Sequence, residues 1–138
     1  MKNIFIQGPV PATLVTEQIQ KHSHLEQIGA HSIFLGQVRR DEGVTAIEYT
    51  AYEAMALEQM HEIREAIIPK YGLSCMHVYH SLGIVKTGEI CLFVFTSAPR
   101  RKAAIAACED ALEQIKTKLP IWGKEIFGED AFQWKQNT

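Results

Sequence analysis

The sequence predicts a single α+β domain covering residues 1–138, and three observations predict it. Two long stretches carry apolar residues at helical spacing, several short β-rich stretches follow one another along the chain, and Pro or Gly residues separate these stretches. Neighbouring strands with helices between some of them are typical of antiparallel or mixed sheets. At 138 residues, the chain is long enough to bury a core without disulfides or a structural metal.

The first part of the chain predicts a strand, a helix and two more strands. Asn3–Gln7 is a short apolar strand, and Thr13–Lys21 has the apolar stripe of a helix. Ala30–Val38 is a strand in which Gly36 allows a bulge or a close backbone approach. Thr45–Tyr52 alternates β-branched or aromatic residues with others, as a half-buried strand does.

The middle of the chain predicts a long helix and a pair of strands. In Glu53–Tyr71 apolar residues recur every three or four positions, and Pro69 and Gly72 end the helix. Leu73–His80 and Glu89–Ser97 are strands, and the second contains a continuous apolar run that suits the centre of a sheet.

A second long helix and two short strands complete the chain. The helix is Arg100–Leu119, and Pro120 ends it because proline lacks the N–H that a helix needs. Ile121–Phe127 and Phe132–Lys135 are short extended segments. The predicted order is therefore β-α-β-β-α-β-β-α-β-β.

Composition excludes several classes of protein. Fourteen Lys and Arg face sixteen Asp and Glu, so the net charge of −2 gives no reason to expect nucleic acid as a partner. No apolar run approaches the roughly 20 residues that span a bilayer, and the N-terminus lacks the pattern of a signal peptide. The cysteines, Cys75, Cys91 and Cys108, are far apart and odd in number, which predicts buried thiols in a reducing compartment. Together with the lack of a membrane-spanning run, this predicts a cytoplasmic protein without a membrane contact.

The sequence predicts no metal and no cofactor. Cys75, His77 and His80 are close in sequence, but strand alternation places Cys75 and His77 on one face and His80 on the other. The chain also lacks the motifs of serine hydrolases, zinc proteases, P-loop enzymes and dinucleotide-binding folds.

Basic residues gather at the ends of three predicted elements. Arg39–Arg40 follows a strand, Arg100–Lys102 opens the second long helix, and the segment KTKLPIWGKE, Lys116–Glu125, closes it. Cations in the first turn of a helix oppose its dipole by about 0.3–1 kcal/mol each, and a bound anion would reverse that penalty. Exposed cations on a surface helix can equally be tolerated, and cations in a last turn complement the dipole without any function.

Taken together, five segments resemble the catalytic large subunit of molybdopterin synthase, the MoaE family, in order and in spacing. These segments are FLGQVRRDEG, IEYTAYEAMA, HSLGIVKTGE, FTSAPRRKAA and KTKLPIWGKE. The resemblance implies an α/β-hammerhead fold with mixed or antiparallel sheets and two long helices. It also implies a homodimer within a heterotetramer, in which a ubiquitin-like small subunit inserts its C-terminal thiocarboxylate into the large subunit. The implied enzyme is a sulfurtransferase that converts cyclic pyranopterin monophosphate into the molybdopterin dithiolene, in molybdenum cofactor biosynthesis.

The resemblance also implies roles for particular residues. Lys116 matches the family's active-site lysine and takes the central electrostatic or acid–base role. Arg39 and Arg100 match its anion-binding arginines, and Gln37 and Val38 lend contacts beside Arg39.

Two positions depart from the family pattern. Pro99 stands where the family often has a histidine, and Gly123 stands where it often has a second catalytic lysine. One hypothesis is that Lys124 supplies the missing ammonium because Gly123 lets the backbone redirect it. Gly123, Lys124 and Glu125 are then substrate-binding residues, with Lys124 also catalytic. The alternative is that Lys116 works with the arginines alone.

Two other classes of function remain open. One is a non-catalytic module that only docks a ubiquitin-like partner. The other is an unrelated protein that binds a small anion or a nucleotide phosphate, for which the same cations would suffice.

Overall fold

The computed structural model describes residues 2–128 and 132–134, and its elements follow the predicted order. In chain order these elements are β1 (Phe5–Gln7), α1 (Ala12–Lys21), β2 (Ala30–Gln37), β3 (Ala46–Ala51), α2 (Glu53–Tyr71), β4 (Cys75–Lys86), β5 (Ile90–Ala98), α3 (Arg101–Lys118), β6 (Ile121–Ile126) and β7 (Phe132–Trp134). The α+β class and the two long helices are confirmed. The last predicted strand residue, Lys135, lies outside the described residues.

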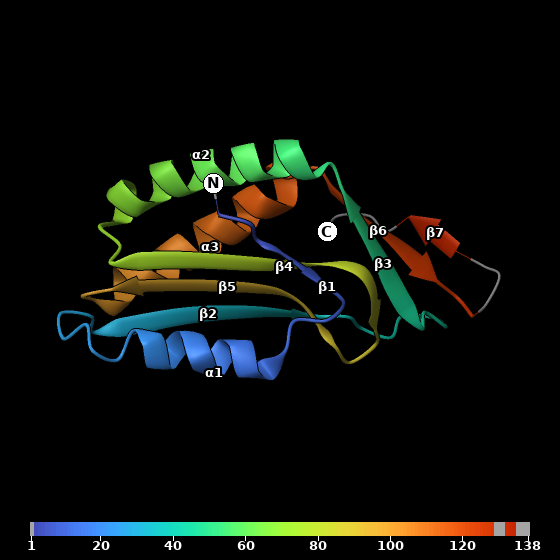
Figure 1. Ribbon diagram of the computed structural model, residues 1–138, viewed down its shortest axis with the longest axis horizontal. Helices are drawn as coiled ribbons and strands as arrows, with labels where there is room; N and C mark the ends of the chain where they lie inside the picture. The colour runs from blue at the N-terminus through green and yellow to red at the C-terminus, as the bar shows by residue number, and fades with distance from the viewer. Residues whose placement is uncertain (1, 129–131, 135–138) are drawn as a thin grey trace.

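The strands form one twisted, open sheet in the order β2-β5-β4-β3-β6-β7, with β1 paired to β4 beside this path. The β1–β4 pair is parallel and the other pairs are antiparallel, so the sheet is mixed, as expected. β2, β5 and β4 run together along the length of the molecule, and β3, β6 and β7 continue the sheet at one end (Figure 1).

β4 is longer than its predicted end at His80. Its first half, Cys75–His80, pairs with β5, and its last residues, Gly83–Lys86, pair with β3. Gly83 has a φ of +82°, a conformation that glycine adopts without penalty, so the strand changes partner there instead of stopping. The change of partner joins the two parts of the sheet.

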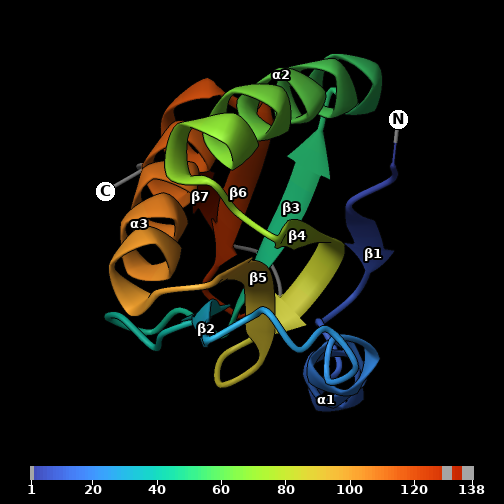
Figure 2. The ribbon, with the colours of Figure 1, turned by 90° about the vertical axis from the view of Figure 1, so that its left-hand side faces the viewer.

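Helices cover both faces of the sheet. α2 and α3 lie side by side on one face, and α1 lies on the other (Figures 1 and 2). Under α2 and α3 the main core gathers small and branched side chains, among them Ile67, Met76 and Ile115. A smaller cluster of Val10, Phe93 and Phe95 packs under α1.

The second long helix, α3, is held firmly in place. Its buried residues recur every three or four positions and are small, so it lies close to the sheet; they are Ala104, Ala107, Cys108, Ala111 and Ile115. Thr96 of β5 donates its hydroxyl to the Ala104 carbonyl at 2.7 Å. Asp110 accepts hydrogen bonds from Lys70 and Tyr71 at the end of α2. These contacts fix where each end of α3 presents its side chains.

Within residues 2–128 and 132–134, no helix combines the length and the hydropathy needed to cross a membrane.

Candidate functional site

Lys116 stands between two adjoining pockets at the end of α3. The residue follows the buried Ile115 and is itself half-buried, so its stem packs while its ammonium reaches the pocket wall. One pocket has a volume of about 360 Å³ and the other about 260 Å³, and Tyr49 lines both together with Lys116. We call the larger one, lined by Gln37, Val38, Arg39, Tyr49, Lys116 and Glu125 among others, the Lys116 pocket.

The end of β2 supplies one wall of the Lys116 pocket. The β2–β5 register shifts between Gly36 and Gln37, which turns the chain out of the ladder. Val38 is buried, its N–H donates to the Glu89 carbonyl at 2.9 Å, and its own carbonyl accepts from Gly88. This anchoring places Gln37 and Arg39 on either side of a fixed residue.

Arg39 does not act as an isolated cation. Its Nε lies 2.9 Å from Asp41 Oδ2 and 2.8 Å from Oδ1, and its side chain is 77% exposed. Asp41, Glu113 and Glu125 line the Lys116 pocket as well, so the pocket mixes cations with carboxylates. A bound anion would compete with Asp41 for the guanidinium.

β6 supplies the opposite wall through alternate residues. Glu125 lies opposite Ile47 of β3 and lines the Lys116 pocket, while Gly123 lies opposite Tyr49 and lines the smaller pocket. Lys124, between them, faces the other side of the sheet, where its Nζ is 3.1 Å from Glu48 Oε1. Lys124 is not among the residues that line either pocket of Lys116, and its role in catalysis stays a prediction.

The physical reason is that Gly123 does not redirect the backbone. β6 is continuous from Ile121 to Ile126, and the φ of Gly123 is not among the positive ones. A Cβ at Gly123 would stand 2.9 Å from Ile47 Cγ2 and 3.2 Å from the Tyr49 ring. The glycine is thus required by close packing beneath β6, and strand alternation continues through it.

Arg100 lies at the far end of α3. It lines a separate pocket of about 480 Å³ with Gly29, Pro99, Arg101 and Lys102. Sixteen residues of helix separate it from Lys116, or about 24 Å at 1.5 Å per residue. A single chain therefore does not bring all three predicted basic groups into one hollow.

Sequence reasoning missed two residues of the site, Tyr49 and His80. Tyr49 is 8% exposed; burial, and then the nearby Cys91, raise the pKa of its hydroxyl, which keeps it protonated. His80 lines the smaller pocket, stacks edge-on against Tyr49 and bonds the Ser81 carbonyl at 2.8 Å. Burial lowers the pKa of His80 to about 4, with Lys116 contributing, so the imidazole is neutral near pH 7. The two residues lie in different strands, and only the folded chain shows that they line a pocket with Lys116.

The arrangement is suited to holding an anion beside polar groups. Lys116 and Tyr49 line both pockets, Arg39 adds a guanidinium to the larger one, and His80 adds an imidazole to the smaller one. Fixed cations in a partly water-excluded pocket stabilise negative charge more strongly than in water. The pocket is large enough for part of a small organic phosphate or the end of a peptide.

A possible metal-binding group lies elsewhere in the described residues. His22, Cys75 and His77 converge on the α1 face of the sheet, away from Lys116.

Comparison with known proteins shows to which family the chain is similar. A family model described as MoaE protein matches residues 10–118. The molybdopterin synthase catalytic subunit of Bacillus subtilis (strain 168) is 38% identical over 122 residues, which are 86% of this chain and 77% of that protein. The protein of the same name from Drosophila willistoni is 42% identical over 114 residues, 79% of this chain and 31% of that protein. The chain thus spans about a third of the length of the Drosophila relatives that it matches.

Two solved structures share the fold. A crystal structure of molybdopterin synthase from Staphylococcus aureus matches with a TM-score of 0.84 and 33% identity, over 99% of this chain and 98% of that one. A complex of subunits 1 and 2 of the molybdopterin-converting factor from Helicobacter pylori 26695 gives a TM-score of 0.84 over 96% of this chain and 88% of that one. At 22% identity, the second likeness shows the fold alone.

Proposed function

The chain belongs to the MoaE family, and from that premise we propose that it is the catalytic subunit of a molybdopterin synthase. In this proposal it transfers sulfur from the C-terminal thiocarboxylate of a ubiquitin-like small subunit to cyclic pyranopterin monophosphate. Two transfers produce the dithiolene of molybdopterin. The observation that carries the proposal is the Lys116 pocket, where Lys116 and Arg39 line one cavity.

The charges of the reaction match these residues. The substrate carries a phosphate, the sulfur donor is an anion, and a carboxylate remains when sulfur has left the donor. Lys116 would stabilise the negative charge that develops at the reacting groups, because it lines the cavity that would hold them. Arg39 would release Asp41 and bind the phosphate or the carboxylate, for which a guanidinium is well shaped.

Polar groups around Lys116 would orient the reactants. Gln37, the Val38 backbone and Glu125 line the cavity and offer donors and acceptors to the pterin. The smaller pocket, of about 260 Å³ and lined by Tyr49, His80 and Gly123 among others, would hold the end of a peptide tail. We propose that the small subunit's C-terminus enters through this second pocket.

Arg100 would join the site only from a second copy of the chain. It is about 24 Å along α3 from Lys116 of its own chain, so the homodimer that we propose must place the N-terminus of one α3 near the Lys116 pocket of its partner. The assembly would then be a heterotetramer of two catalytic and two small subunits. A cytoplasmic location fits the three free thiols of Cys75, Cys91 and Cys108.

The experiment is a reconstitution. The chain is mixed with a thiocarboxylated small subunit and cyclic pyranopterin monophosphate, and dithiolene product is measured. The control uses the same small subunit ending in an ordinary carboxylate, which carries no sulfur to transfer. Product with the thiocarboxylate alone is the expected result, and its absence with correctly assembled subunits would refute the proposal.

One observation favours a second candidate, a module that only docks the small subunit. The position of the family's second lysine is Gly123, and Lys124 faces the other side of the sheet. The same reconstitution separates the two functions, because a docking module would form the complex and yield no dithiolene.

A further inference from the structure

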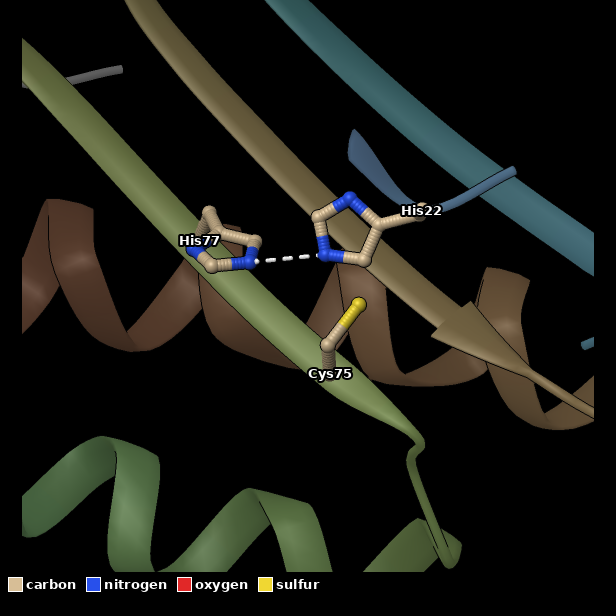
Figure 3. Close-up of side chains that lie close together, drawn as sticks. All are labelled: His22, Cys75 and His77. Atoms are coloured by element: carbon tan, nitrogen blue, oxygen red, sulfur yellow. Dashed lines mark hydrogen bonds between the residues drawn. The ribbon is translucent and has the colours of Figure 1, made fainter. Parts of the chain in front are cut away.

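Three side chains with metal-binding atoms converge on the face of the sheet that α1 covers. His22 is the C-terminal cap of α1, and Cys75 and His77 are alternate residues at the start of β4. Their ligand atoms all lie within 4.8 Å of one another. The imidazoles face each other across a short gap and the Cys75 sulfur points toward them (Figure 3). The sequence placed Cys75 and His77 on one face correctly, but the third group comes from a helix more than fifty residues earlier.

The hydrogen bonds of His22 determine which of its ring nitrogens carries a lone pair that could bind a metal. Its Nδ1 lies 2.6 Å from the Gln18 carbonyl oxygen, which can only accept, so Nδ1 carries the proton. In the neutral ring, Nε2 then has a lone pair, and it points at His77. An imidazole whose Nδ1–H is held by a backbone carbonyl is the usual form of a metal-binding histidine.

His77 completes a pair that shares one proton. Lys2 Nζ lies 3.0 Å from His77 Nδ1 and donates to it, so the ring's proton sits on Nε2 and is donated to His22 Nε2 at 3.1 Å. His22 therefore already presents a lone pair at Nε2, and His77 presents one at its Nε2 once that proton has moved to Nδ1.

We propose that His22 Nε2, His77 Nε2 and Cys75 Sγ bind one Zn²⁺ ion, with a water molecule as fourth ligand. Two nitrogen ligands of one tetrahedral zinc, each about 2.0–2.1 Å from the ion, lie about 3.3 Å from each other. The Nε2 atoms of His22 and His77 are 3.1 Å apart here, which is close to that value. The sulfur approaches by rotation about the Cα–Cβ bond of Cys75, which is half-buried and not locked in a disulfide.

The proton balance is simple and involves no redox change. The Cys75 thiol loses its proton to solvent and binds as a thiolate. The proton of His77 Nε2 is replaced by the metal and a proton occupies Nδ1 instead, while the Lys2 ammonium swings into water. Lys2 is exposed, so this movement needs no rearrangement of the core.

The surroundings select the kind of metal. The three ligands are two imidazoles and a thiolate, which suit zinc and other thiophilic ions and not Mg²⁺ or Ca²⁺, which require oxygen ligands. The cations Lys2, Lys21 and Arg64 all act on His77 and oppose a divalent ion, so Lys2 is expected to weaken binding. A small pocket of about 40 Å³, lined by Lys2, Arg64 and His77 among others, adjoins His77.

Metal binding here would fasten α1 to the sheet. His22 ends α1, and Phe95 of β5 packs against both histidine rings. The cluster lies on the opposite face of the sheet from the core under α2 and α3, so this site is separate from sulfur transfer and does not depend on the function proposed above.

The test is metal binding by the full chain without a histidine tag. Zinc is titrated in competition with a chromophoric chelator, and Co²⁺ is added separately as a spectroscopic probe. We expect one ion per chain, a thiolate-to-cobalt charge-transfer band and the visible bands of a tetrahedral site. Cys75→Ser, which nearly preserves shape, should abolish the charge-transfer band and weaken zinc binding at least tenfold.

Matched variants separate the cluster from surface histidines and from loss of folding. His22→Gln and His77→Gln should each weaken zinc binding at least tenfold, whereas His24→Ala, which changes an exposed histidine two residues from His22, should not. Lys2→Met should strengthen zinc binding several-fold, an effect that mere damage to the fold cannot produce. Zinc should raise the Tm of the wild-type chain and leave that of Cys75→Ser unchanged.

Binding of less than one ion per chain, a cobalt band that survives Cys75→Ser, or equal zinc affinity in Cys75→Ser and the wild type would each overturn the proposal. Circular dichroism of each metal-free variant shows whether it is folded before its affinity is compared.

Discussion

Gly123 and Ile47 are packed so closely that a Cβ on Gly123 would stand 2.9 Å from Ile47 Cγ2. Ile47 is 3% exposed and belongs to the main core, so its methyl group cannot move aside cheaply. This contact explains why a glycine occupies a position on the wall of the smaller pocket. It also means that a longer side chain there would disturb the floor beneath Lys116.

Gly123→Ala should therefore lower stability by about 1–3 kcal/mol, the usual cost of overpacking a core. The measurement is urea unfolding of the variant against the wild type. Lys124→Ala is the matched control in the same strand, because it removes a partly exposed pair with Glu48 and should cost about 1 kcal/mol or less. Equal stability of Gly123→Ala and the wild type would contradict the packing argument.

His80 should make stability depend on pH in a defined window. Its pKa is about 4 in the folded chain and near 6.5 in the unfolded chain, so the unfolded state binds more protons between these values. The free energy of unfolding should fall as pH drops from about 6.5 to about 4, by up to about 1.4 kcal/mol per pH unit from this residue. In His80→Gln, the free energy of unfolding should change less steeply with pH over the same range. Some dependence should remain, because the pKa of His77 is also lowered to about 4. An unchanged slope would remove His80 from this role.

Arg100 should act across the interface between two copies. Arg100→Met and Lys116→Met should each abolish most dithiolene formation when every chain carries the change. Chains of the two variants, unfolded and refolded together, should regain about a quarter of wild-type activity, because half of the dimers then contain one intact site. Full activity of Arg100→Met, or no recovery in the mixture, would show that Arg100 does not complete the site in this way.

The order of elements was predictable because it depends on local patterns. The buried stripe of α3 and the proline after it mark that helix in sequence, and the alternation in β3 marks that strand. The predicted β4 was too short because its extension past Gly83 depends on pairing with β3. No local sequence pattern indicates this pairing.

The site residues could be predicted as neighbours only where they follow one another in a single segment of the chain. Gln37, Val38 and Arg39 follow one another at the end of β2 and line one pocket with Lys116, while their roles in substrate binding stay predictions. The side on which Lys124 lies depends on whether β6 is continuous through Gly123, and this was decided by contacts with Ile47 and Tyr49. The meeting of His22 with Cys75 likewise depends on how α1 docks, which is a tertiary property.

The most direct measurement is the single-turnover rate of sulfur transfer by Lys116→Met and Lys124→Met, each with a thiocarboxylated small subunit and cyclic pyranopterin monophosphate. Loss of a fixed cation that stabilises developing charge costs about 10²–10³ in rate, so we expect a loss of this size for Lys116→Met. Lys124→Met should stay within about twofold of the wild type, since its pair with Glu48 is a surface interaction. A folded Lys116→Met with the wild-type rate, or a loss in Lys124→Met as large as that in Lys116→Met, would contradict the account.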